Sequence, residues 1–423
     1  MIVRGGTVVT AQGVAEADIA TDGGRITEVG PNLRGGGDEI DATGFHVFPG
    51  GIDSHVHFNE PGRTEWEDIA HGSTALAAGG YTTFIDMPLN NLPVTTTPEA
   101  FDLKLAAMQR SSRVDFGLWG GLVPENLDQL KPLVERGAIG FKAFMCPSGI
   151  DEFAACDEAT LREGMKRIAD LGSVLLVHAE DPARLTEPAG PSARDFLESR
   201  PSEAELSAVH DAIEWARQAG CALHIVHVSS LPSAALIRAH RNNGVDVSGE
   251  TCPHYLLYGA GNLERLGGLG KCAPPFRTKE ELWPALVEGW LQMVVSDHSP
   301  STLELKRGSD FRKIWGGVSG CQSTRQLLLA QGKLELPLVA ALTSTNVARR
   351  FQLEGKGDIA PGFDADLWIV DLNHEDVVRN EDLLYRNPFS VHKGQKIRGA
   401  TVRTLVRGKD PASGAFIRPG VRS

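Results

Sequence analysis

The chain has 423 residues, a formal net charge of −12 at pH 7, 41% hydrophobic residues and 23% charged residues. This length suits one large α/β barrel with a smaller appended domain. The sequence contains no run of about 18 apolar residues and no long run of Lys and Arg, which argues against a membrane-spanning protein and against nucleic acid or an anionic membrane as partner. A neutral small molecule is the expected substrate.

The cysteines and the first residues indicate the compartment. The six cysteines form no CxxC pair, and the N-terminus lacks the long apolar core of a secretory signal. We therefore expect reduced thiols and a cytoplasmic location. Cys146 and Cys252 lie beside motifs discussed below, but small buried cysteines are common packing residues, so neither is assigned to a site.

Both ends of the chain predict β-structure. Residues 1–47 contain short β-rich runs between Gly-rich turns, which predicts a small antiparallel sheet. The same texture returns beyond about residue 355, in Gly357–Ile359, Ala365–Val370 and Thr401–Val406. We expect residues 1–47 and 356–423 to complete one shared β-sandwich domain.

Residues 48–355 alternate buried apolar runs with stretches of helical spacing, such as Trp66–Ala78 and Pro98–Gln109. Eight strands alternating with helices are typical of a TIM (β/α)8 barrel, so the predicted fold class is α/β. The Pro- and Gly-rich residues 185–202 are expected to form a barrel loop. The eight predicted strands are Val47–Phe58, Thr82–Met87, Asp115–Leu122, Gly140–Met145, Val174–His178, Ala222–Val228, Asp246–Thr251 and Met293–Ser296.

Polar residues stand at the carboxyl ends of these strands, where the chemistry of such barrels collects. His55 and His57 end the first strand, and their spacing puts both rings on one strand face, where they can share a cation. The HxH pattern alone leaves open two histidines on a solvated face. Other strand ends supply further candidates: Lys142, His178, His227, His254 and Asp297.

This group is larger than a single zinc requires, because zinc takes three protein ligands and keeps an open position. The excess indicates two metals. A lysine buried near two dications is driven to its neutral amine, which reacts with carbon dioxide to form a carbamate that can bridge both ions. A lone lysine at a strand end would keep its head in water, but the apolar neighbours of Lys142 favour the bridging alternative.

The order of these residues along the strands resembles the binuclear cyclic amidohydrolases, and the resemblance covers nearly the whole chain. That family contains dihydroorotases, hydantoinases and dihydropyrimidinases, allantoinases, and metal-free interaction proteins. The resemblance implies two divalent metals, with zinc favoured over iron, cobalt or manganese. It assigns His55, His57 and Asp297 to one metal and His178 and His227 to the other, with Lys142 as a bridging N6-carboxylysine.

The resemblance also implies a mechanism. A hydroxide held between the metals attacks the ring carbonyl, and Asp297 takes its proton and returns it to the departing ring nitrogen. Because all six ligand positions are filled, a catalytically silent structural homologue is the least favoured alternative.

Within the family, the loop His55–Glu67 resembles the allantoinases. Dihydroorotases typically carry an arginine where this chain has Asn59, and an asparagine where it has Leu89; hydantoinases usually carry a tyrosine where it has Pro147. The resemblance therefore implies hydrolysis of allantoin to allantoate, a step of purine catabolism. Dihydroorotase and hydantoinase or dihydropyrimidinase activity are the alternatives, and relatives suggest a homotetramer.

Six residues near strand ends are candidates for substrate binding: Asn59, Asn90, Ser148, His254, Gly316 and Gly317. The backbone of Cys272–Pro275 is a further candidate. Three histidines have competing interpretations, because His224 is expected to be packed, His71 to lie on the first barrel helix, and His298 to support the site or contact substrate. The residues Arg63, Trp66 and Glu67 are interpreted as fastening their loop.

Overall fold

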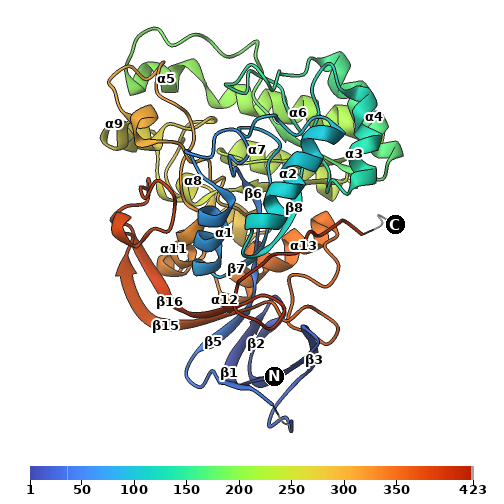
Figure 1. Ribbon diagram of the computed structural model, residues 1–423. Coiled ribbons are helices and arrows are strands. Elements are labelled where there is room, and N and C mark those ends of the chain that lie inside the picture. Colours follow the sequence, from blue (N-terminus) through green and yellow to red (C-terminus); the bar gives the residue numbers. More distant parts are fainter. Residues whose placement is uncertain (36, 421–423) are drawn as a thin grey trace.

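The computed structural model of the protein describes residues 1–35 and 37–420 (Figure 1). Its larger part is a barrel of parallel strands, in which β8 and β9 form one interrupted strand because β8 pairs with β7 and β9 with β10. A parallel bridge between Val56 and His298 closes the barrel. The strands are β6 Gly51–Val56, β7 Tyr81–Asp86, β8 Asp115–Leu118, β9 Gly120–Gly121, β10 Phe141–Phe144, β11 Val174–His178, β12 Ala222–Ile225, β13 Val247–Thr251 and β14 Met293–Val294.

Each of the eight predicted strands thus overlaps a strand of the barrel, in the predicted order. The run Val47–Phe58 was predicted as one strand, and this is wrong, because it contains the end of β5 (His46–Pro49) and all of β6. Gly50 separates the two strands, and a Cβ there would lie 2.1 Å from Thr82 Oγ1. A glycine is therefore needed where the chain passes from the terminal sheet into the barrel.

Helices surround the barrel (Figure 1). The first two match their predictions, and α2 begins at Pro98 after the N-cap Thr97, whose hydroxyl accepts from Ala100 N. The loop predicted over 185–202 contains a short helix, α5. The helices are α1 Ile69–Ala78, α2 Pro98–Ser111, α3 Leu130–Arg136, α4 Glu158–Asp170, α5 Ala193–Ser199, α6 Ser202–Ala219, α7 Leu231–Asn242, α8 Pro253–Leu257, α9 Leu263–Leu266, α10 Trp283–Val287, α11 Thr324–Gln331, α12 Leu336–Ala340 and α13 Asn346–Phe351.

Both chain ends build a second sheet of seven strands, as predicted for the small domain. The strand order is β16-β15-β5-β1-β2-β3, with β4 also on β1. The expectation of a purely antiparallel N-terminal sheet is wrong, because β1 pairs in parallel with β4 and β5. The strands are β1 Ile2–Thr10, β2 Gly13–Asp22, β3 Arg25–Gly30, β4 Glu39–Asp41, β5, β15 Leu367–Val377 and β16 Lys396–Leu405.

The terminal sheet and the barrel share a fully buried cation. The Arg325 guanidinium lies 4.2 Å from the Trp368 ring centroid and donates to the carbonyls of Pro49 and Gly80.

The β-rich prediction for Gly357–Ile359 is wrong, because this segment bends at Gly357, whose φ is +84°. The proposed domain limits at residues 47 and 355 stay a prediction. Within the described residues, no helix is long and apolar enough to cross a membrane.

Candidate metal centre

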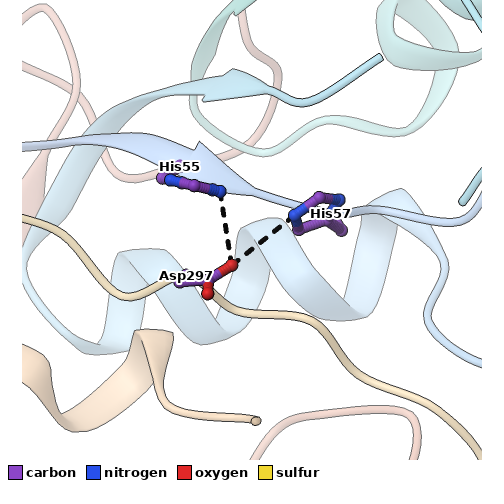
Figure 2. Close-up of side chains that lie close together, drawn as sticks. All are labelled: His55, His57 and Asp297. Atoms are coloured by element: carbon purple, nitrogen blue, oxygen red, sulfur yellow. Dashed lines mark ion pairs between the residues drawn. The ribbon is translucent and has the colours of Figure 1, made fainter. Parts of the chain in front are cut away.

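Two histidines and an aspartate converge at the carboxyl end of β6. Figure 2 shows the rings of His55 and His57 each directed at the same oxygen of the Asp297 carboxylate. The distances from Asp297 Oδ1 are 3.3 Å to His55 Nε2 and 3.5 Å to His57 Nε2. One ligand atom from each residue lies within 4.8 Å of the others, a spacing that suits coordination of one ion.

A second group stands beside the first. The Nδ1 atom of His178 lies 3.0 Å from Nε2 of His227, and the ring of His227 lies 5.5 Å from that of His55. The Lys142 amine is buried with them, 4.6 Å from the Phe144 ring centroid, and has no hydrogen-bond partner among the described residues. All six predicted ligands face one cavity of about 380 Å³.

Burial gives these groups the protonation states that metal binding requires. Desolvation lowers the pKa of His57, His178 and His227, so the imidazoles are neutral and carry a free lone pair. Desolvation also lowers the pKa of Lys142 to about 7. Burial alone would raise the pKa of Asp297, but the neighbouring imidazoles outweigh it and hold that pKa well below its usual range.

A buried carboxylate orients the first group. Glu250, in β13, accepts from His55 Nδ1 at 2.5 Å and lies 3.0 Å from Nε2 of His224. With its Nδ1 proton donated to Glu250, His55 turns the lone pair of Nε2 toward Asp297. The predicted packing role of His224 agrees with this placement, because its ring is fully buried behind Glu250 and its Nδ1 contacts Ser248 Oγ at 2.7 Å.

A second buried carboxylate orients the other group. Glu180 Oε2 accepts from His178 Nε2 at 2.7 Å, which leaves His178 Nδ1 to face His227. Arg200 holds the same carboxylate through two bonds, of 3.1 Å to Oε1 and 2.5 Å to Oε2. No role was predicted for Glu180 or Glu250 from the sequence. In the sequence they are marked only by position: Glu180 follows His178 by two residues, and Glu250 lies in the strand before His254.

The backbone is strained at three residues that line the cavity. His227, Asp297 and Asn90 have φ values of +37°, +44° and +76°, in the left-handed region that non-glycine residues rarely adopt. Such conformations persist only where the surrounding structure holds them, and they concentrate at functional sites. This clustering supports a functional role for the cavity.

The substrate-binding candidates divide into two groups. Four of them line the cavity: Asn90, Ser148, Gly316 and Gly317. Asn59 and His254 do not line it. Asn59 is fully buried and donates to Pro300 O at 3.4 Å, while the His254 ring packs against Tyr255 and Phe276. Trp315, beside the predicted Gly316, lines the cavity too, as do Phe196, Arg200, Lys271 and Ser299, which were not predicted from the sequence.

The model of the amidohydrolase family matches residues 46–409. The chain belongs to the amidohydrolase family. This amidohydrolase is 49% identical to an allantoinase of Rubrobacter xylanophilus, over 99% of this chain and 97% of the relative. It is 50% identical to an allantoinase of Solibacter usitatus, over 96% of this chain and 92% of the relative.

The fold comparison agrees with the family. The structure of an L-hydantoinase (dihydropyrimidinase) from Arthrobacter aurescens matches with a TM-score of 0.95 and 31% identity, over 99% of both chains. The predicted combination of a TIM barrel and a terminal sheet domain is therefore confirmed. This amidohydrolase is a hydrolase, and the convergent histidines and aspartate fit the metal dependence of the family.

Proposed function

We propose that this amidohydrolase hydrolyses the hydantoin ring of allantoin to give allantoate, a step of purine catabolism. The observation that carries the proposal is the similarity, over nearly the full length, to relatives named allantoinase, six of which are 43–50% identical. The reaction breaks the ring carbon–nitrogen bond and adds the hydroxyl of water to carbon and its proton to nitrogen.

The cavity supports a neutral ring as substrate. Three of the basic side chains that line it have partners: Arg200 pairs with Glu180, Arg312 pairs with Asp310, and Lys271 donates to backbone carbonyls. A further one, Lys313, is exposed to solvent. A substrate carboxylate such as that of dihydroorotate would have to compete with these partners. An uncharged hydantoin with a ureido group needs amide-like partners instead.

Two residues that distinguished the subfamilies stand in the cavity wall. Leu89 and Pro147 both line it, where dihydroorotases and hydantoinases typically carry an asparagine and a tyrosine, respectively. Asn59 stands behind the wall, so we propose a supporting role for it rather than substrate contact. We likewise propose that His254 supports the site and does not contact the substrate. Asn90, Ser148 and the backbone of Gly316 and Gly317 remain the proposed substrate contacts.

We propose that His55, His57 and Asp297 hold one divalent ion and that His178 and His227 hold the other, with carboxylated Lys142 between them. The amine of Lys142, buried without a partner among the described residues, supports this arrangement. When bound, the ions, for which we favour zinc, would polarise the ring carbonyl and lower the pKa of water. Asp297 would accept the proton of the attacking water and pass it to the departing ring nitrogen.

Other side chains of the chain keep this proton acceptor in place. Ser299 Oγ donates to Asp297 Oδ1 at 3.2 Å, and the imidazoles of His55 and His57 approach the same oxygen. Glu250 and Glu180 fix the orientation of His55 and His178. The arrangement holds the acceptor before substrate enters, which reduces reorganisation during the reaction.

The direct test is a substrate panel of allantoin, dihydroorotate and 5-substituted hydantoins, assayed on metal-loaded protein whose metal content is also determined. We expect allantoin turnover with about two ions per chain. Preference for dihydroorotate or for a simple hydantoin would replace the proposed substrate, and the absence of both metal and turnover would support a silent homologue.

We also propose a cytoplasmic homotetramer. Within the described residues no cysteine forms a disulfide and all six are buried, as suits a reducing compartment. Light scattering should give a particle of about four chains of 45.4 kDa each. A particle of one chain would contradict the proposed assembly.

A further inference from the structure

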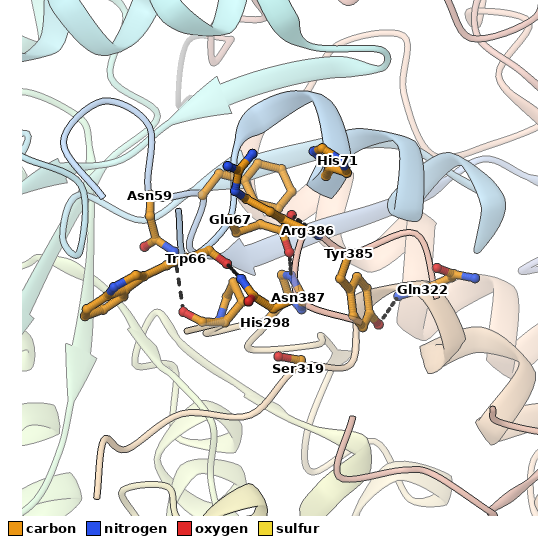
Figure 3. Close-up of polar contacts among 12 residues, drawn as sticks. Asn59, Trp66, Glu67, His71, His298, Ser319, Gln322, Tyr385, Arg386 and Asn387 are labelled. Atoms are coloured by element: carbon orange, nitrogen blue, oxygen red, sulfur yellow. Dashed lines mark hydrogen bonds and ion pairs between the residues drawn. The ribbon is translucent and has the colours of Figure 1, made fainter. Parts of the chain in front are cut away.

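The connection between β15 and β16, residues 378–395, reaches the barrel, and we call it the C-terminal arm. It begins and ends in the terminal sheet, but it contacts segments that follow barrel strands (Figure 3). Ser390 Oγ donates to the carbonyl of Ser319 at 2.5 Å, and Tyr385 Oη accepts from Gln322 N at 3.0 Å. The arm is therefore anchored on the segment that leaves β14.

One contact of the arm leads to buried Glu67. The backbone N–H of Arg386 donates to Glu67 Oε1 at 3.0 Å, and Glu67 Oε2 lies 3.4 Å from His298 Nε2. The backbone of Gly320 donates to His298 Nδ1 at 3.2 Å, so Nδ1 is an acceptor and Nε2 carries the proton. His298 therefore donates to Glu67, and both side chains are fully buried.

This path continues to two proposed metal ligands. His298 directly follows Asp297, and its carbonyl accepts from His57 N at 2.8 Å. A displacement of Glu67 would shift His298 and, with it, the backbone of the two ligands. The strained φ of Asp297 makes this backbone dependent on its surroundings.

A second contact leads to the cavity wall. The Asn387 side-chain amide donates to the carbonyls of Glu65 and Trp66, at 2.9 and 2.7 Å. The Trp66 ring meets the Trp315 ring edge-on, with 4.8 Å between centroids, and Trp315 lines the cavity. Asn387 therefore holds the backbone of Trp66, and the Trp66 ring in turn packs against Trp315 in the cavity wall.

We infer that the C-terminal arm, which extends from the terminal sheet, positions the active site, and that the positioning residues are Asn387 of the arm and Glu67, which the arm contacts. Glu67 holds the backbone of His57 and Asp297 through His298, and Asn387 holds Trp66, whose ring packs against the wall residue Trp315. The two residues act on different parts of the reaction, because the first supports the reacting groups and the second the space for the ring. Only the kinetic test of this inference depends on the proposed hydrolysis of allantoin.

The test compares each variant with a matched control in the metal-loaded full chain. Glu67→Gln is paired with Glu65→Gln, since Glu65 is exposed in the same loop, and Asn387→Ala with Asn373→Ala, since Asn373 is exposed in β15. We expect Glu67→Gln to lower kcat for allantoin about tenfold with little change in KM. We expect Asn387→Ala to raise KM about fivefold to tenfold with little change in kcat.

Melting temperature and metal content are measured on the same preparations. A loss of stability without the split between kcat and KM would reduce the arm to a structural contact and overturn the inference. Equal kinetics of each variant and its control would overturn it as well.

Hydrogen–deuterium exchange separates this inference from the proposed function, because it needs no substrate. Residues 59–68 should exchange faster in Asn387→Ala than in Asn373→Ala. If this difference appears while the unaltered protein does not hydrolyse allantoin, the proposed substrate fails and the arm's positioning role stands. If allantoin is hydrolysed and the exchange does not differ, the positioning role fails alone.

Discussion

The two halves of the candidate metal centre are built differently. The half at His55 and His57 contains its own anion, Asp297, which lies within 3.5 Å of both rings. The half at His178 and His227 contains two neutral imidazoles and the amine of Lys142, which has no bonding partner among the described residues. The first half has a complete donor set in its side chains, whereas the second needs the amine of Lys142 to be converted into an anionic carbamate.

The largest effect is expected from Lys142→Ala, which removes the group that would join the halves. Activity should fall by about 1000-fold or more, because the second ion loses its anionic ligand. Added acetate or propionate should restore part of it, measured as allantoin hydrolysis against carboxylate concentration. Lys166→Ala, at an exposed lysine of α4, is the control. Full activity of Lys142→Ala without added carboxylate contradicts the bridge.

Asp297→Asn tests the half that already holds its anion. The amide cannot accept a proton from water, so kcat should fall by about 1000-fold. The second half should keep its ion, so metal analysis should find about one ion per chain. The exposed Asp170, changed to Asn, provides the control. Retention of both ions and of near-normal kcat would show that Asp297 is neither ligand nor proton acceptor.

The two supporting carboxylates allow each half to be weakened separately. Glu250→Gln should lower metal affinity on the His55 side, and Glu180→Gln should lower it on the His178 side, each by about 10–100-fold. Chelator titration with the two variants side by side measures this, and each serves as the control for the other. Identical loss of both ions in both variants would mean that the halves do not bind independently.

The smallest effect is expected from Cys146→Ser. Cys146 lies beside the half at His178 and His227, 3.6 Å from the Arg200 guanidinium. Burial raises the pKa of its thiol to about 12, so we expect an inert packing residue. Its kcat/KM for allantoin should stay within about twofold of the unaltered protein. A loss of about tenfold or more would give the thiol a role in the site.

The sequence was most informative where short spacing and strand order carry the chemistry. The HxH pair and the residues ending later strands predicted both the barrel and the six side chains that meet in its cavity. Glu180 and Glu250 were not predicted as supporting residues, because a carboxylate near a strand gives no sign of which histidine nitrogen it contacts. The residue pair Glu67 and Arg386 is separated by 319 positions, and no local pattern reveals such a contact.

Residues close to a motif in sequence do not all face the cavity. Asn59 follows His57 by two positions, yet it turns behind the cavity and donates to the carbonyl of Pro300. His254 follows a strand that ends at the site, but its ring packs against Tyr255. Side-chain direction after a strand ends depends on the loop, and the period of two no longer applies there.

The measurement that tests the central claim most directly is ¹³C NMR of protein loaded with metal in ¹³C-bicarbonate, compared with Lys142→Arg treated in the same way. We predict a carbamate carbon signal in the unaltered protein that is absent from the variant, because the buried neutral amine of Lys142 joins the two halves as a carbamate. Two bound ions and full allantoin turnover without that signal would contradict this account of the site.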